Sequence, residues 1–270
     1  MSRSALFDFI KKQESYLCVG LDTDISKIPS FFLEFEDPIF EFNKRIIDAT
    51  RDLCVAYKPN LAFYEVLGAK GWEALQKTIA YIPDTHLVIA DAKRGDIGNT
   101  SNYYAKAFFE KLGADAITVA PYMGSDSVQP FIGFPNKWVI VLALTSNMGS
   151  KDFQMEARAD GSRFFELVME KNMAWGGPDE LMFVVGATHP DQFARIREIC
   201  PDYFLLIPGV GAQGGDLEAI SKSAMNDHCG ILVNASRSIL YAGSGEDFDL
   251  QAQTAAKELQ VAMKKHLSAL

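Results

Sequence analysis

Residues 86–121 read HLVIADAKRGDIGNTSNYYAKAFFEKLGADAITVAP, and this stretch holds the repeating unit of the chain. An apolar run, HLVIADAK (86–93), is followed by the helix-like segment NTSNYYAKAFFEKL (99–112) and by a second apolar run, ADAITVAP (114–121). Short apolar runs separated by a segment with helical spacing are typical of a β-α-β unit in a parallel sheet.

The same alternation extends over the whole chain. The candidate strands are YLCVGLD (16–22), VAYKPN (55–60), HLVIADAK (86–93), ADAITVAP (114–121), WVIVLALTS (138–146), LMFVVGAT (181–188), YFLLIPGV (203–210) and GILVNASR (230–237). Helix-like segments lie between them, and QAQTAAKELQVAMKKHL (251–267) closes the chain. Eight such units predict an α/β fold of the (β/α)8 TIM-barrel type, with a doubly wound open sheet as the alternative.

The chain length of 270 residues suits one barrel, and no linker rich in Pro, Gly or Ser divides the sequence. We therefore expect a single barrel domain over residues 1–270, with an N-terminal helical extension before the first strand. The stretch 147–160, NMGSKDFQMEARAD, is longer than a usual barrel loop. An active-site lid and a solvated connector would explain it equally well.

Composition limits the possible partners. The chain is 48% hydrophobic and 23% charged, which is typical of a globular protein. Its 26 Lys and Arg against 35 Asp and Glu give a net charge of −9, which argues against nucleic acid or anionic lipid as a partner. Any anionic ligand must therefore be held by local groups.

Cysteine spacing and the N-terminal sequence point to the cytoplasm. The four cysteines show no CxxC spacing and indicate neither a disulfide framework nor a zinc site: Cys18, Cys54, Cys200 and Cys229. The N-terminus MSRSALFDFIKKQES carries charges throughout and has no apolar signal-peptide core. The apolar run from Trp138 to Leu144 is too short to span a bilayer. We expect a cytoplasmic protein with no membrane partner and no bound metal.

Polar side chains gather at the ends of the predicted strands, where barrel active sites form. They are Asp22, Lys58, Asn60, Asp91, Lys93, Thr145, Ser146, Asn147 and Arg237. The densest group is DAKRGD (91–96), in which Asp91 and Lys93 project from one face of a strand and Asp96 stands where a helix would begin. An interior ion pair followed by a helix cap is the structural alternative.

Lys58 strengthens the functional interpretation. A lysine buried in a barrel mouth must be paired, and Asp91 is the obvious partner. The alternative is a lysine whose amine reaches solvent from the strand end. Asp22 suits the acceptance of hydrogen bonds from sugar hydroxyls, although it could instead cap the following turn.

The segment IPGVGAQGGDLEAI (207–220) passes through a glycine-rich turn into a helix. The first turn of that helix can present free backbone N–H groups to a phosphate, and Arg237 can bind the same group from the next strand. A helix start and a surface arginine form the alternative. Although the segment matches GxGxxG, dinucleotide binding is excluded by its place after the seventh strand and by the lack of an acidic residue after the next strand.

Three further polar groups carry weaker signals. His86 and His189 stand alone without metal-ligand spacing, which favours structural roles. Ser146 and Asn147 could hydrogen-bond a flat polar ring, and a turn at the strand end explains them as well.

Three motifs together identify a family. DAKRGDIGNTS (91–101), with KPN (58–60) before it and PGVGAQGG (208–215) after it, resembles the orotidine 5′-phosphate decarboxylase family in its longer bacterial subgroup. The resemblance runs from about Val19 to Ser238. It implies a homodimeric (β/α)8 barrel that converts orotidine 5′-monophosphate (OMP) to UMP and CO2 in pyrimidine synthesis, without metal or organic cofactor.

The resemblance also implies roles for individual residues. Lys58, Asp91, Lys93 and Asp96 would form the family's charged array, with Asp96 reaching the site of the partner subunit. The substrate would be bound by Asp22, Asn60, Thr100, Ser146, Asn147, Pro208, Gln213, Gly214, Gly215 and Arg237, with Thr100 also crossing the interface. Two positions depart from the family pattern, since Met148 replaces a Pro and Ala120 replaces an Asn.

The chemistry of the reaction explains the array. Loss of CO2 from C6 of the pyrimidine leaves a carbanion in the ring plane, which an ammonium held by carboxylates can stabilise and protonate. Lys93 fits this role, and Asp91 would lie close to the departing carboxylate. Whether that proximity speeds the reaction by repulsion is left open by the sequence.

Three other functions could use a barrel with such residues. A magnesium-dependent sugar-phosphate decarboxylase or aldolase would need an acidic residue where Lys58 stands. A Schiff-base aldolase would need an uncharged lysine, whereas carboxylates beside Lys93 favour the ammonium form. The third is a nucleotide-binding barrel that has lost its chemistry, which the complete array makes less plausible.

Overall fold

The computed structural model describes residues 1–210, 216–268 and 270, and eight parallel strands form a closed barrel within it. The strands are β1 (Leu17–Gly20), β2 (Ala56–Lys58), β3 (Leu87–Arg94), β4 (Ala116–Val119), β5 (Trp138–Leu144), β6 (Leu181–Val185), β7 (Phe204–Pro208) and β8 (Ile231–Ala235). Each strand pairs with its neighbours in chain order, and β8 returns to β1. The barrel prediction is confirmed, and the open sheet is excluded.

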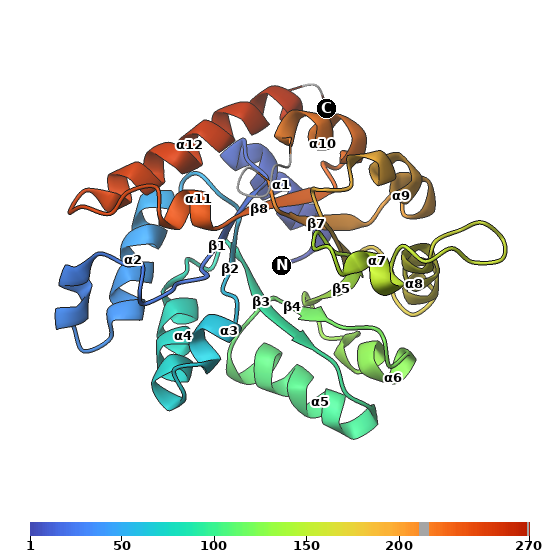
Figure 1. Ribbon diagram of the computed structural model, residues 1–270, viewed down its shortest axis with the longest axis horizontal. Helices are drawn as coiled ribbons and strands as arrows, with labels where there is room; N and C mark the ends of the chain where they lie inside the picture. Colours follow the sequence, from blue (N-terminus) through green and yellow to red (C-terminus); the bar gives the residue numbers. More distant parts are fainter. Residues whose placement is uncertain (211–215, 269) are drawn as a thin grey trace.

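Helices surround the strands (Figure 1). They are α1 (Arg3–Gln13), η1 (Ser30–Glu34), α2 (Pro38–Thr50), α3 (Ala62–Glu65), α4 (Ala69–Tyr81), α5 (Gly98–Lys106), η2 (Ala107–Lys111), α6 (Ser125–Val128), η3 (Gln129–Phe131), α7 (Ser150–Phe153), α8 (Phe164–Met173), η4 (Pro190–Gln192), α9 (Phe193–Ile199), α10 (Leu217–Ala224), α11 (Arg237–Leu240) and α12 (Phe248–Leu267). The last helix, α12, packs against both α2 and α10 and so closes the ring.

The N-terminal extension is the helix α1. Its residues Leu6 and Ile10 are fully buried, because an amphipathic helix turns its apolar face to the core. The Met1 ammonium donates to the Asn136 carbonyl at 2.8 Å, and the Trp138 indole donates to the Met1 carbonyl at 2.8 Å. Since Trp138 begins β5, the start of α1 lies at the N-terminal end of the barrel, away from the ends where the polar residues gather.

The strands are buried on both faces, as their nearly continuous apolar sequences predict for a helix-covered parallel sheet. The third strand differs from the others at its end. Its pairing with β4 shifts register between Ala90 and Arg94, and Lys93 inside this shift has a φ of 49°. The left-handed conformation is costly for a side-chain-bearing residue, so the surrounding contacts must hold it.

The stretch 147–160 is more ordered than a simple connector. It contains the short helix α7, and an antiparallel bridge joins Ala157 to Arg163 just after it. The Gln154 side chain returns to the end of β5, where it accepts from the Thr145 amide at 2.7 Å.

In the described part of the chain, no helix has both the length and the apolar character needed to span a membrane.

Candidate active site

A cavity of about 440 Å³ opens among the residues at the C-terminal ends of the strands. Ten of the residues selected from the sequence line it: Asp22, Lys58, Asn60, Asp91, Lys93, Thr145, Ser146, Asn147, Pro208 and Arg237. They come from segments that span most of the chain, and barrel closure brings them to one place. The same cavity is also lined by Thr118, Asn234 and Ser236, which sequence reasoning did not select.

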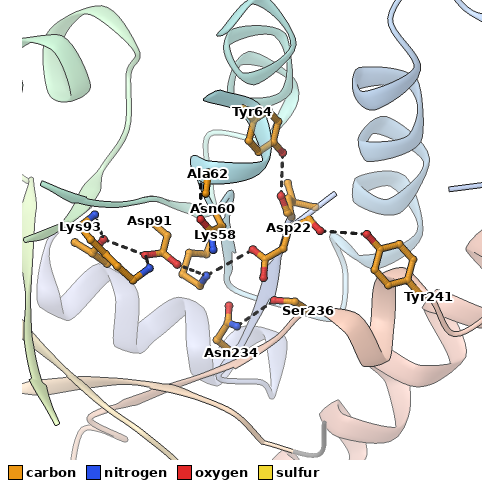
Figure 2. Close-up of polar contacts among 12 residues, drawn as sticks. Asp22, Lys58, Asn60, Ala62, Tyr64, Asp91, Lys93, Asn234, Ser236 and Tyr241 are labelled. Atoms are coloured by element: carbon orange, nitrogen blue, oxygen red, sulfur yellow. Dashed lines mark hydrogen bonds and ion pairs between the residues drawn. The ribbon is translucent and has the colours of Figure 1, made fainter. Parts of the chain in front are cut away.

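A chain of three charges crosses the cavity (Figure 2). The Lys58 amine donates to Asp91 Oδ2 at 2.8 Å, and the Lys93 amine donates to Asp91 Oδ1 at 2.5 Å. Lys58 and Asp91 are buried, with 5% and 9% of their side chains exposed, whereas 49% of the Lys93 side chain is exposed. Lys93 is therefore the lysine that can contact a ligand, while the buried Lys58 binds the Asp91 carboxylate. The alternative in which the Lys58 amine reaches solvent is excluded.

The buried pair is electrostatically matched. Burial alone would lower the pKa of Lys58, but the charges of Asp91 and Asp22 outweigh it and raise that pKa. Burial alone would raise the pKa of Asp91, but Lys58 and Lys93 outweigh it and hold that pKa well below its usual range. Both groups consequently stay ionised at neutral pH, which keeps a fixed negative charge beside the Lys93 amine.

Thr118 on β4 supports this arrangement from the neighbouring strand. Its hydroxyl accepts from the Lys93 backbone N–H at 2.8 Å and donates to Asp91 Oδ1 at 3.1 Å. One buried hydroxyl thus fixes both the left-handed backbone of Lys93 and the carboxylate to which its amine is bound. The sequence carries a weak signal for this role, namely a polar residue inside the apolar run AITV.

On the β1 side of the cavity, Asp22 lies 3.9 Å from the Lys58 amine, measured at Oδ1. This oxygen is buried and has no hydrogen-bond donor among the described residues. The backbone around it is held by two tyrosines, since Tyr64 donates to the Leu21 carbonyl at 3.0 Å and Tyr241 donates to the Asp22 carbonyl at 3.1 Å. A rigid carboxylate without its own donor is suited to accepting a hydrogen bond from a ligand.

The ends of β2 and β5 supply amide and hydroxyl groups. Asn60 Oδ1 accepts from the Ala62 N–H at 3.2 Å and so begins α3, while the residue still lines the cavity. Asn147 Oδ1 accepts from the Thr145 hydroxyl at 2.6 Å. Ser146 packs closely against Gly186, where an added Cβ would come within 2.6 Å of the Ser146 nitrogen. These residues line the cavity at the ends of β2 and β5.

The β7 and β8 ends form the expected anion side. Pro208 and Arg237 line the cavity, and Arg237 makes no ion pair with any residue the structure describes. The predicted residues Gln213, Gly214 and Gly215 lie outside the described residues.

Two N–H groups in the first turn of α10 are already occupied. The first turn of α10 does not present all its N–H groups to a phosphate, because the Asp216 side chain accepts from Glu218 at 2.9 Å and from Ala219 at 3.4 Å. An aspartate at the N-cap satisfies those donors itself.

Asp96 and Thr100 are not among the described residues that line the cavity. Asp96 follows β3, and its Oδ1 accepts from the Ile97 N–H at 2.7 Å. Thr100 is exposed on α5. Within the described residues, neither of them makes a hydrogen bond or ion pair with Lys58, Asp91 or Lys93.

The histidines have structural contacts, as expected. His86 Nε2 is 2.7 Å from the Arg51 carbonyl, and His189 Nε2 is 3.0 Å from the Thr145 carbonyl. Within the described ranges, no group of three or more His, Cys, Asp or Glu side chains is placed to hold a metal ion.

Comparison with known proteins identifies a family. Residues 15–247 match the orotidine 5′-phosphate decarboxylase / HUMPS family. The chain is 55% identical over 273 residues to orotidine 5′-phosphate decarboxylase from Bacteroides fragilis, covering 100% of both. It is 57% identical over 270 residues to the Parabacteroides distasonis protein of the same name, covering 99% of this chain and 96% of the relative.

The fold is similar to that of solved structures with the same name. The structure of Leishmania donovani OMP decarboxylase matches with a TM-score of 0.85 and 39% identity, over 98% of this chain and 99% of that one. A family match that spans the whole barrel, with relatives above half identity over their full length, shows that this chain belongs to the orotidine 5′-phosphate decarboxylase / HUMPS family.

Proposed function

We propose that the protein is a carboxy-lyase that decarboxylates orotidine 5′-monophosphate to UMP and CO2 in pyrimidine biosynthesis. Family membership supports the reaction. One observation supports assigning the reaction to this site: the Asp91 carboxylate lies between two lysine amines, at 2.8 and 2.5 Å, in the cavity at the barrel mouth. The rival metal-dependent decarboxylase or aldolase would need a carboxylate at the position of Lys58.

The proposed chemistry is electrostatic stabilisation followed by proton transfer. As the bond between C6 and the carboxylate breaks, its electron pair stays on C6 and CO2 departs. The Lys93 ammonium stabilises this charge as it develops and then gives a proton to C6, which forms UMP. Because Lys93 is half exposed to the cavity while Asp91 and Lys58 are buried, its amine is the one with access to the substrate.

The remaining cavity groups would orient the substrate. Asp22 would accept from the ribose, Ser146 and Asn147 would contact the pyrimidine, and Arg237 would bind the phosphate from the β8 end. Binding energy from the phosphate, far from C6, can be used to hold the pyrimidine against the charged array.

We further propose a homodimer whose active sites are shared. Asp96 and Thr100 are not among the described residues that line the cavity, and several apolar side chains at the same end of the barrel are exposed in the single chain. These exposed side chains follow β2, β3 and β4 and include Val66, Ile97, Tyr103, Tyr122 and Met123. A two-fold interface over this surface would bury them and would bring Asp96 of the partner subunit to the Lys93 amine.

We also propose a cytoplasmic location. It is supported by the state of Cys18, Cys54, Cys200 and Cys229, which are all buried free thiols in the structure.

Turnover of the substrate tests the function directly. The purified protein is incubated with orotidine 5′-monophosphate, and loss of the orotate absorbance is followed with and without a chelator. Rapid conversion to UMP at the same rate in both samples supports the proposal. No conversion would refute it, and conversion abolished by the chelator and restored by magnesium would support the metal-dependent rival.

Reassembly of two inactive variants tests the shared site. Lys93→Ala and Asp96→Ala homodimers should each be nearly inactive. After subunits are exchanged at random, about half of the dimers are mixed, and each mixed dimer has one intact site, so about a quarter of the wild-type activity should return.

Mixing Lys58→Ala with Lys93→Ala is the matched control, because both residues belong to the same chain and no intact site can form. Activity in this control, or none in the test pair despite verified exchange, would contradict a site shared through Asp96.

A further inference from the structure

Asn234 is a polar residue in the last barrel strand that neither the sequence motifs nor the charged array explains. It lies on β8 opposite Cys18 of β1 and Pro208 of β7, and it lines the cavity. Only 7% of the residue is exposed. The adjacent positions Val233 and Ala235 are apolar and buried, so the asparagine is an exception in an otherwise apolar strand.

The two ends of the Asn234 amide differ in their contacts. Its Nδ2 donates to the Ser236 hydroxyl at 3.2 Å. Its Oδ1 is buried and has no hydrogen-bond donor among the described residues. Buried carbonyl oxygens nearly always have a donor, because an unsatisfied acceptor loses the hydrogen bond it would make in water.

The surrounding residues offer no donor to this oxygen. The nearest part of β1 is Gly20, where an added Cβ would lie 3.2 Å from Asn234 Oδ1 and 1.9 Å from the Ser236 hydroxyl. A glycine here lets the asparagine and serine side chains approach the strand. The Lys58 amine donates to Asp91 at 2.8 Å, and within the described residues it makes no hydrogen bond to Asn234 Oδ1. Because none of the described residues supplies this donor, a molecule bound in the cavity can supply it.

A second buried acceptor on the same side indicates what kind of donor fits. Asp22 Oδ1 also lacks a hydrogen-bond donor, and it too lines the cavity on the β1 side. In Figure 2 the Asn234 oxygen points in the direction of Asp22 and Lys58. Two acceptors on neighbouring strands are suited to a ligand with more than one hydroxyl donor, which a phosphate or a carboxylate does not provide.

We propose that Asn234 is a further substrate-positioning residue, whose side-chain carbonyl accepts a hydrogen bond from a ribose hydroxyl of the bound nucleotide. The inference rests on the proposed function, because that function supplies a ribose between the pyrimidine and the phosphate. It places the sugar against the β1–β8 seam of the barrel, between the charged array and Arg237.

The test compares three ligands on two proteins. Dissociation constants for UMP, 2′-deoxyUMP and 3′-deoxyUMP are measured by calorimetry with the wild-type protein and with Asn234→Ala. The variant should bind UMP about five- to tenfold more weakly, as expected for one neutral hydrogen bond. For the ligand that lacks the contacted hydroxyl, wild type and variant should agree within about twofold, which also identifies that hydroxyl.

A purely structural role predicts a different pattern. If Asn234 served only to hold Ser236 and thereby Arg237, Asn234→Ala would weaken all three ligands by the same factor, and Ser236→Ala would reproduce that uniform loss. A uniform loss, or an unchanged affinity for UMP, overturns the inference. If Asn234→Ala does not fold in a thermal melt, Asn234→Val, which suits a strand and has no carbonyl, is compared on the same ligands.

The wild-type protein separates this inference from the proposed function. If wild type does not bind UMP at all, the proposed function fails and the inference fails with it. If wild type binds UMP and no ligand shows the selective loss, the proposed function stands and only the role of Asn234 is refuted.

Discussion

Removal of the Asp91 carboxylate should destabilise the protein more than removal of its partner amine. In Asp91→Ala, the Lys58 amine remains in a side chain that is only 5% exposed, and its remaining counter-charge is Asp22 at 3.9 Å, beyond hydrogen-bond distance. An uncompensated buried charge of this kind costs about 3–5 kcal/mol of unfolding free energy. In Lys58→Ala, Asp91 keeps the Lys93 amine at 2.5 Å and the Thr118 hydroxyl at 3.1 Å, so the loss should be about 1–3 kcal/mol.

Urea unfolding at pH 7 and a fixed protein concentration measures both values. A third variant, Lys58→Met combined with Asp91→Leu, removes both charges and should be at least as stable as Lys58→Ala, since apolar replacement of a buried ion pair is often neutral or stabilising. If Lys58→Ala is as destabilising as Asp91→Ala, or if neither exceeds about 1 kcal/mol, the asymmetry derived from these contacts is wrong.

The pH dependence of the wild-type stability follows, for this pair, from the two pKa shifts. The pKa of Asp91 is lowered in the folded protein, so its contribution is present above the ordinary value near 3.9 and is lost as pH falls through the folded value. The pKa of Lys58 is raised, so its contribution is present below about 10.4 and is lost as pH rises through the folded value. The two groups should therefore contribute a constant amount to the stability of the wild-type protein from about pH 5 to pH 9, which urea unfolding across that range measures.

Three further outcomes are expected. Lys93→Ala should lower kcat for decarboxylation at least about a hundredfold with an unchanged circular dichroism spectrum, and a variant that keeps more than a hundredth of the rate would exclude a proton-donor role. Arg237→Ala should weaken UMP binding in calorimetry by about 1.5–3 kcal/mol, whereas equal binding of UMP and uridine by wild type would refute phosphate recognition. Thr118→Val removes the hydroxyl between the Lys93 N–H and Asp91 at nearly constant volume. It should lower kcat by about tenfold with little change in KM. A raised KM with unchanged kcat would contradict the positioning role of Thr118.

The fold could be predicted because its signals are local. Runs such as HLVIADAK (86–93) and WVIVLALTS (138–146) are apolar at successive positions instead of alternating between apolar and polar. This pattern is typical of a strand that is covered on both faces. All eight predicted strands form, in chain order around the barrel. The unpredicted helices α3, α6, α7 and α11 have only four residues each, too few to show a helical period in the sequence.

Part of the site could also be predicted from local sequence. Asp91 and Lys93 share a strand face through the two-residue period, and a lysine near the mouth needs a carboxylate, so the pairing with Lys58 followed from type and position. The α10 start shows the limit of this reasoning. The glycine-rich turn suggested free N–H groups, but the Asp216 side chain accepts hydrogen bonds from two of them. This contact depends on the orientation of the Asp216 side chain, which the sequence pattern does not give.

The sequence by itself determined the barrel, the face on which the polar residues gather and the charged pair on β3. Only the tertiary structure decided which of those residues meet across the barrel and which backbone conformations they adopt. Thr118 reaches Lys93 through a register shift between β3 and β4, and Asn234 reaches the Gly20 side of the cavity because β8 closes on β1. The physical reason is that periodicity acts over a few residues, whereas barrel closure depends on the register of all eight strand pairs together.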